Sequence, residues 1–263
     1  MATIDDPRWI VMWLSAGTIF LGCKGLTWWS APRRGGLAAW LTWPGLDAIG
    51  FFATTARVCQ PARAEWFFAA AKTALGAALF WFGGAVFGNH DLLRGWLGMI
   101  GIVFVLHFGL FHLLSCFWRT IGRDAPPIMN HPWAATSLSD FWGRRWNRAF
   151  RDLAHRFLFR PLTRMLNPRF ALLFGFVVSG VVHEIVITVP AGGGYGGPTL
   201  YFCLQGLGIA LEHTRFGKRI GLGQGWRGWL FAALMLLGPV CLLFPPVFVR
   251  NIVLPMMDAL GAV

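Results

Sequence analysis

Long apolar runs are the feature that most limits what this chain can fold into. Stretches approaching the roughly 20 apolar residues that cross a bilayer as a helix recur along the sequence. Only 13% of the 263 residues are charged, against roughly 25% in soluble domains. No polar stretch is long enough to bury a core of its own. The sequence therefore predicts an all-α fold, a multi-pass transmembrane helix bundle organised as a single domain over residues 1–263.

The apolar runs predict about six to eight membrane spans. Residues 36–56 are apolar but are broken by Pro44, Gly45 and Asp47, so we expect a re-entrant or interfacial piece there. The last run should bend or break near Pro245. The clearer spans are expected at Trp9–Cys23, Trp66–Gly88, Trp96–Trp118, Phe170–Val189, Tyr201–Leu211 and Trp229–Val249.

The net charge of +12 is distributed as membrane topology requires. Ten of the 23 Lys and Arg residues lie in the loop 119–169, between apolar runs. A second basic loop covers residues 213–227, whereas the glycine-rich turn at 189–198 has no Lys or Arg. Basic loops stay on the cytoplasmic side of a membrane. We therefore expect an integral membrane protein with loop 119–169 cytoplasmic, membrane lipids around it and no nucleic-acid partner.

The longest polar segment, ATSLSDFWGRRWNRAFRDLAHRFLFRP at residues 135–161, has the pattern of an amphipathic helix. Ser137, followed three positions later by Asp140, is typical of a helix start. Aromatic residues repeat on one face and arginines on another, so we expect an interfacial helix around residues 138–159. Asn147 lies at the edge between these faces. Because guanidinium groups commonly bind phosphates, an anionic-ligand site is expected among Arg144, Arg145, Arg148 and Arg151.

His183 and Glu184 lie about 13 residues, or roughly 20 Å, inside an apolar span. Ionisable residues at that depth are costly and mark a functional site or a polar cavity. Ser179 and Gly180, one turn earlier, share the face of His183 and leave room for a substrate. Glu184 points about 100° away around the helix, so we expect it to bond a neighbouring helix. A histidine that only packs against another helix remains the alternative.

The other histidines and the five cysteines form no metal-binding pattern in the sequence. His107 and His112 are five positions apart and do not share a helix face, so we expect them to pack or to bond between helices. The metalloprotease motif H-E-x-x-H fails because Ile187 occupies its fifth position. The cysteines are scattered and are expected as small core residues. No metal site and no bound cofactor are expected.

The run ATSLSDFWGRRWN at residues 135–147, followed by SGVVHE at 179–184, resembles the wax synthase branch of the membrane-bound O-acyltransferases. WPGLDA at 43–48 and YFCLQGLGIALE at 201–212 also resemble that branch. The similarity covers about residues 40–215. It implies transfer of an acyl group from acyl-CoA, as the co-substrate, to the hydroxyl of a lipophilic alcohol.

The resemblance implies that His183 is the catalytic histidine and that Asn147 is its polar partner. The chemistry agrees, because esterification needs a base that takes the proton of the attacking alcohol. Asn147 would donate to the developing oxyanion or position the acyl donor, and the arginines would hold the phosphates of CoA. Trp146 and Phe150 would line the acyl path in a cavity shared with His183. The alternative function is a non-catalytic membrane scaffold or lipid-binding relative of the same architecture.

Overall fold

The computed structural model describes residues 8–32, 35–53, 58–87 and 90–262. These residues form helices and connecting loops with no β-strand among them, which confirms the all-α prediction. The chain divides into two compact units, one made of residues 1–129 and 249–263 and the other of residues 130–248. The single domain over the whole chain stays a prediction.

Four helical segments of the described chain are long and apolar enough to cross a membrane. They are Arg8–Trp29, Asp91–Thr120, Pro168–Ala191 and Gly225–Leu243. The integral membrane location is therefore confirmed, and the last segment ends just before Pro245, as predicted. The count of six to eight spans stays a prediction, and Gly88, the predicted end of one span, lies outside the described residues.

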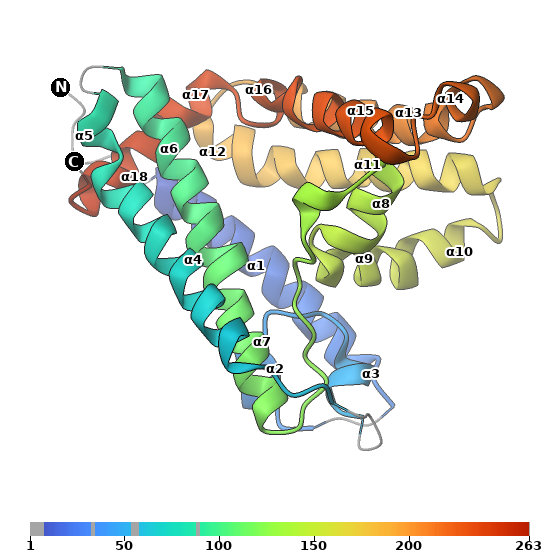
Figure 1. The fold of residues 1–263 in the computed structure, drawn as a ribbon, viewed down its shortest axis with the longest axis horizontal. Coiled ribbons are helices and arrows are strands. Elements are labelled where there is room, and N and C mark those ends of the chain that lie inside the picture. Colours follow the sequence, from blue (N-terminus) through green and yellow to red (C-terminus); the bar gives the residue numbers. More distant parts are fainter. Residues whose placement is uncertain (1–7, 33–34, 54–57, 88–89, 263) are drawn as a thin grey trace. The chain divides into compact units, whose positions relative to one another are not determined.

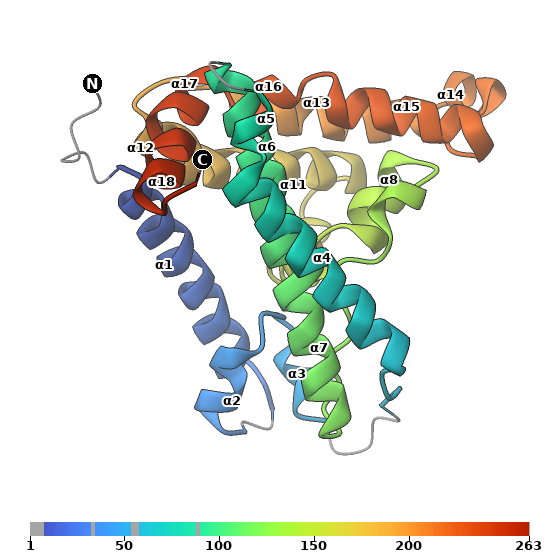
Figure 2. The same cartoon turned by 60° about the vertical axis from the view of Figure 1, so that its left-hand side comes forward.

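In the first unit, α4 (Arg63–Phe82) runs beside a long helical segment (Figures 1 and 2). That segment consists of α6 (Asp91–Val103), the π-helical η1 (Phe104–Leu110) and α7 (Phe111–Thr120). Glycines let the backbones approach: a Cβ on Gly76 would lie 2.6 Å from the nitrogen of Val105. The unit also contains α1 (Arg8–Trp29), α2 (Leu37–Thr42), α3 (Ala48–Phe51), α5 (Gly84–Phe87), η6 (Val249–Val253) and α18 (Leu254–Ala259).

The first helix continues to Trp29, beyond its predicted end, because Lys24 is satisfied inside the protein. Lys24 is completely buried. Its ammonium donates hydrogen bonds to the carbonyl oxygens of Trp43 at 2.6 Å and Gly45 at 2.8 Å, and it lies 3.2 Å from the ring centre of Trp40. A buried amino group that is hydrogen-bonded in this way can lie inside a helix.

The segment 36–56 is interrupted, as its sequence predicts. It forms the short helices α2 and α3, joined by the loop that supplies both carbonyl oxygens to Lys24. Asp47 begins α3 by accepting a hydrogen bond from the amide of Gly50 at 3.1 Å. Pro44 and Asp47 therefore mark a turn and a helix start, not positions inside one span.

The second unit is built around α11 (Pro168–His183) and α13 (Gly197–Glu212), which pack side by side (Figure 1). Asn167 caps α11 by accepting from the amide of Arg169 at 2.9 Å, and Pro168 takes the first helical position. The core between these helices, α8 (Leu138–Asp140) and α15 (Gly225–Leu237) contains Leu138, Phe176, Tyr201, Phe202, Ile209 and Ala232.

The remaining elements of this unit are short helices and one longer helix, α15. They are η2 (Pro132–Ala134), α8 (Leu138–Asp140), η3 (Phe141–Arg145), α9 (Arg148–Ala154), η4 (His155–Phe159), α10 (Arg160–Leu162), η5 (Glu184–Thr188), α12 (Val189–Ala191), α14 (Arg215–Ile220), α15 (Gly225–Leu237), α16 (Val240–Leu243) and α17 (Pro246–Phe248).

The structure corrects the expectation of one continuous helix over residues 138–159. The helix breaks at Trp146, which is extended, and Asn147, whose φ of 41° and ψ of 58° are left-handed. Asparagine adopts this conformation more readily than other residues with a side chain. Its Oδ1 accepts from the amide of Phe150 at 3.4 Å, so Asn147 begins a second helix.

Candidate functional site

The tryptophan-rich block, residues 135–147, contains a helix start that is held from two sides. Ser137 accepts a hydrogen bond from the amide of Asp140 at 2.9 Å, as predicted. The carboxylate of Glu212 accepts from the amides of Leu138 at 2.5 Å and Ser139 at 3.2 Å, and from the Ser139 hydroxyl at 3.0 Å. Amides at a helix start are costly when buried without partners. Glu212 therefore fixes the start of α8 to the end of α13.

The role of Glu212 was not predicted from the sequence. Glu212 is the last residue of α13, where a negative charge opposes the helix dipole. It is also buried, with 5% of its surface exposed. An acidic residue at the end of an apolar helix was the available signal, since such a residue needs a partner elsewhere.

Glu184 makes a second contact of the same kind. Its Oε1 accepts from the amide of Thr199 at 3.1 Å and from the Thr199 hydroxyl at 3.0 Å. Its other oxygen accepts from the hydroxyl of Thr188. Because Thr199 lies in the first turn of α13, Glu184 caps that helix. The prediction that Glu184 bonds a neighbouring helix is confirmed.

His183 uses one ring nitrogen for structure and leaves the other available. Its Nδ1 is 2.6 Å from the carbonyl oxygen of Ser179. A carbonyl only accepts hydrogen bonds, so Nδ1 carries the proton and Nε2 of the neutral ring carries the lone pair. No described residue hydrogen-bonds Nε2. This is the arrangement that a general base requires.

The helix changes form directly after His183. Residues 184–188 make the π-helical turn η5, and α12 follows with Pro190 in its first turn. Proline has no amide hydrogen and its ring disturbs the preceding helical turn. Such π-helical turns are frequent at functional sites.

Phe202 of α13 brings the two motifs together. Its ring centre is 4.5 Å from that of His183 and 5.5 Å from that of Trp142. The rings of His183 and Trp142 are therefore at most 10.0 Å apart, the sum of those two distances. Trp142 also donates from its indole nitrogen to Gln205 Oε1 at 3.4 Å. The tryptophan-rich block and the histidine thus share one helix as their support.

The predicted substrate residues near Asn147 lie at the helix break. Trp146 stacks on Phe141, with ring centres 5.5 Å apart and planes 12° from parallel. Asn147 and Phe150 are half-buried, and the amide of Phe150 is held by Asn147. A cavity shared by Asn147 and His183 stays a prediction.

The space predicted beside Gly180 is filled by α13. A Cβ on Gly180 would meet the Cα of Thr199 at 2.6 Å, so this glycine serves the close approach of α11 and α13. The hydroxyl of Ser179 donates to the carbonyl oxygen of Gly175 at 3.0 Å. An open hollow of about 540 Å³ lies on the Glu184 side, lined by Glu184, Tyr195, Gly196, Thr199, Leu200 and Cys203.

The predicted phosphate-binding arginines are arranged around acidic residues. Arg144, at 2.8 Å, and Arg145 both bind the carboxylate of Asp140. Arg151 pairs with Asp152 at 2.8 Å. The Arg144 side chain is 76% exposed. The last of the four, Arg148, makes no ion pair with a described residue.

Burial disfavours the charged form of Asp140, but the hydrogen bonds and charges of Arg145 and Arg144 outweigh it. The pKa of Asp140 therefore lies below its ordinary value. The carboxylate is 6% exposed, so its attraction to the arginines is poorly screened by water.

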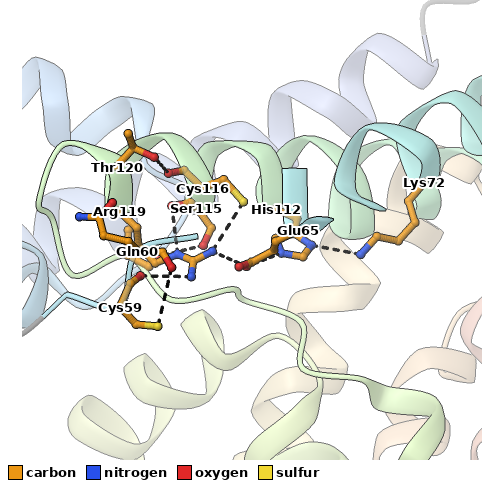
Figure 3. Close-up of polar contacts among 10 residues, drawn as sticks. Cys59, Gln60, Glu65, Lys72, His112, Ser115, Cys116, Arg119 and Thr120 are labelled. Carbon is orange, nitrogen blue, oxygen red and sulfur yellow. Dashed lines mark hydrogen bonds and ion pairs between the residues drawn. The ribbon is translucent and has the colours of Figure 1, made fainter. Parts of the chain in front are cut away.

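The first unit contains a separate polar cluster between α4 and α7 (Figure 3). His112 is 2.9 Å from Glu65 through Nε2 and 3.0 Å from Lys72 through Nδ1, so the expectation that it bonds between helices is confirmed. Arg119 binds Glu65 and lies 3.6 Å from the sulfur of Cys116. Glu65, His112 and Cys116 have the atom types of metal ligands within 4.8 Å of one another. The Lys72 ammonium already binds His112, and the Arg119 guanidinium already binds Glu65 and Cys116. The network is therefore satisfied by its own charged groups.

The fold and the site define a helical membrane protein with a histidine in an apolar helix whose Nε2 no described residue hydrogen-bonds. Residues 125–204 match the model of the membrane bound O-acyl transferase family. The matched segment contains Asn147, His183 and Phe202. The predicted resemblance to the wax synthase branch of that family is confirmed by the curated relatives.

Three relatives illustrate the similarity. The chain is 32% identical over 149 residues to probable long-chain-alcohol O-fatty-acyltransferase 7 of Arabidopsis thaliana, covering 50% of this chain and 42% of that relative. It is 40% identical over 74 residues, 25% of this chain and 21% of the relative, to the long-chain-alcohol O-fatty-acyltransferase of Simmondsia chinensis. It is 42% identical over 70 residues, 24% of this chain and 20% of the relative, to acyl-CoA–sterol O-acyltransferase 1 of Arabidopsis thaliana. The matches thus span less than half of each relative, and no solved structure matches significantly.

We expect Asp140 to make the stability of this region depend on pH. Its pKa is lower in the folded protein than the value of about 4 in the unfolded chain, so its contribution is present above about pH 5 and is lost as the pH falls through the folded pKa. Asp140→Asn should lower the free energy of unfolding at pH 7 by about 2 kcal/mol. It should also reduce the decrease in that free energy as the pH falls from about 5 to about 3. Unfolding of the purified protein in detergent, followed at several pH values, measures both effects.

The matched control is Asp152→Asn, because the Asp152 side chain is 43% exposed and water screens its ion pair with Arg151. It should change stability by no more than about 0.5 kcal/mol. Equal effects of the two substitutions would contradict the special role of Asp140.

Proposed function

We propose that this chain is a membrane-embedded O-acyltransferase that transfers an acyl group from acyl-CoA to the hydroxyl of a lipophilic alcohol. The observation that carries the proposal is the hydrogen bond from His183 Nδ1 to the carbonyl oxygen of Ser179. It leaves Nε2 as the basic nitrogen, within the segment that matches the acyltransferase family. The names of the relatives support an alcohol as the acyl acceptor.

In the proposed reaction His183 Nε2 removes the proton of the alcohol as its oxygen attacks the carbonyl carbon of the thioester. A carbon–oxygen bond forms and the carbon–sulfur bond of the acyl-CoA breaks. The imidazolium then returns the proton to the leaving CoA thiolate, so the ester and free CoA are released and the base is regenerated. The hydrogen bond to Ser179 keeps the ring in the required tautomer and stabilises the positive charge on it.

The surroundings of His183 favour transfer to an alcohol over hydrolysis. His183 lies at the end of an apolar helix and its ring packs on Phe202. An apolar site keeps water away from the thioester. A lipophilic alcohol, by contrast, reaches such a site from the lipid phase.

Asn147 has a second proposed role beside its capping contact. Its Oδ1 is directed to the amide of Phe150, so the NH2 group is the half of the amide that can act as a donor. We assign this group to the developing oxyanion or to the thioester carbonyl, where one donor contributes about 3 kcal/mol to the transition state. Trp146 and Phe150 would then border the acyl chain.

The arginines complete the proposed donor site. The phosphates of CoA would bind to Arg144, Arg145, Arg148 and Arg151 on the cytoplasmic side of the membrane, where loop 119–169 is predicted to lie. Asp140 holds two of them and is itself held at a helix start. In this proposal the CoA end of the donor would lie at the mouth and its acyl end would point toward the apolar core.

The class of reaction is tested with membranes that contain the protein, labelled acyl-CoA and a panel of long-chain alcohols and sterols. Separation of the products by thin-layer chromatography should show labelled ester that depends on the added alcohol. Labelled fatty acid alone would indicate hydrolysis. No labelled product with any alcohol would favour the alternative, a non-catalytic scaffold or lipid-binding relative.

His183→Ala should reduce ester formation by about 100-fold or more, since general base catalysis contributes factors of this size. The matched control is His213→Ala, because His213 also donates from Nδ1 to a carbonyl four residues earlier, that of Ile209 at 2.8 Å, but is exposed. The control should retain the rate of the unchanged protein. Normal turnover in His183→Ala membranes with an equal amount of inserted protein would remove His183 from the mechanism.

Substitutions at Asn147 should separate its two roles. Asn147→Asp keeps an acceptor for the Phe150 amide and tolerates the left-handed backbone, so stability should fall by no more than about 0.5 kcal/mol. It removes the NH2 donor, so ester formation should fall about 100-fold. Asn147→Gly removes the capping acceptor but adopts the left-handed backbone readily, so stability should fall by only about 0.3 kcal/mol while the donor is again lost. Full activity of Asn147→Asp would mean that Asn147 is only a helix cap.

A further inference from the structure

The segment 213–227 carries positive charge that nothing in the described structure neutralises. Its four basic side chains are exposed, and none forms a hydrogen bond or an ion pair with a described residue. The sequence contains no Asp or Glu between Glu212 and Asp258. The four residues are Arg215, Lys218, Arg219 and Arg227.

The short helix α14 (Arg215–Ile220) is held rigidly at the end of α13. Thr214 begins it by accepting from the amide of Gly217 at 2.9 Å. Gly217 is buried, and a Cβ there would lie 2.2 Å from the carbonyl oxygen of Leu211. Gly221, with φ of 82°, ends the helix in a left-handed conformation that favours glycine. The basic residues are thus presented from a fixed backbone.

The same helix separates basic and apolar side chains. Phe216 and Ile220 are four positions apart and share one side, whereas Arg215 and Arg219 share another. Phe216 is 63% exposed, and Trp226, at the start of α15, is 70% exposed. Large exposed aromatic side chains beside basic ones are typical of a membrane interface.

The position of this segment in the chain fits such an interface. It leads directly into Gly225–Leu243, one of the four segments able to cross a membrane. The start of α15 is tied to the preceding part of the unit, since Trp229 donates to the carbonyl oxygen of Trp133 at 2.9 Å. A Cβ on Gly228 would meet the carbonyl oxygen of Thr136 at 2.1 Å. The helix therefore emerges beside the start of the tryptophan-rich block.

We propose that α14 and the start of α15 form a binding surface for anionic phospholipids. The phosphate groups would contact Arg215, Lys218, Arg219 and Arg227, and the rings of Phe216 and Trp226 would enter the acyl region. The cytoplasmic leaflet carries the anionic lipids of a membrane, which agrees with the predicted cytoplasmic side of this loop. The surface is separate from the proposed acyl-transfer site, and its test does not use acyl transfer.

The test measures thermal unfolding of the full chain in a nonionic detergent with added phospholipid. Phosphatidylglycerol should raise the unfolding midpoint by about 3 °C relative to phosphatidylcholine with the same acyl chains, because a ligand that binds only the folded state stabilises it. High salt should reduce this difference. The variant Arg215→Gln/Lys218→Gln/Arg219→Gln should lose it while keeping its midpoint in phosphatidylcholine, since these side chains have no partners to lose.

The matched control removes the same charge elsewhere, in Arg160→Gln/Arg164→Gln/Arg169→Gln, whose residues are also exposed. It should keep the response to phosphatidylglycerol. An equal loss in both variants would show that only net charge matters, and an unchanged response in the α14 variant would place the lipid elsewhere. A similar rise with inorganic phosphate would indicate an anion site and not a lipid surface. Each of these three results would overturn the proposal.

Discussion

The amide groups at a buried helix start have no water to hydrogen-bond. The structure of the second unit depends on which protein groups accept these hydrogen bonds. Glu184 binds the first turn of α13, and Glu212, at the other end of α13, binds the start of α8. The two carboxylates therefore connect three helices in series. His183 directly precedes Glu184, and the amides held by Glu212 directly precede the tryptophans of the block. The same contacts therefore hold both motifs against α13.

The parts of this arrangement that depend on local chemistry could be predicted from the sequence. The helix starts at Ser137 and Asn167, the break before Pro245 and the outward direction of Glu184 follow from capping, proline geometry and helical period. The break at Asn147 could not be predicted, because the helical period continues through it and the left-handed turn shows only in the backbone. Lys24 and Glu212 were missed because their partners are distant in sequence.

The polar groups inside the helices mostly have structural roles, and this gives His183 its significance. Lys24 is bound by two carbonyl oxygens, and the charges of Glu65 and Arg119 bind each other. His183 is different, because one nitrogen is bound by the backbone and no described residue hydrogen-bonds the other. Asn147 combines both kinds of role, since a capping asparagine occupies the position that the acyltransferase resemblance assigns to chemistry. A cap and a catalytic donor are compatible because they use opposite halves of the amide.

We infer that His183 presents an unprotonated Nε2 because its Nδ1 donates to the carbonyl oxygen of Ser179. Nitrogen NMR of the detergent-solubilised protein, with isotopically labelled histidine, reports the protonation of each ring nitrogen. The chain has seven histidines, so the signals of His183 are identified by their loss in His183→Ala. We expect a neutral ring with a protonated Nδ1 and an unprotonated Nε2. A ring protonated at Nε2, as the neutral tautomer or as the imidazolium, would contradict this inference.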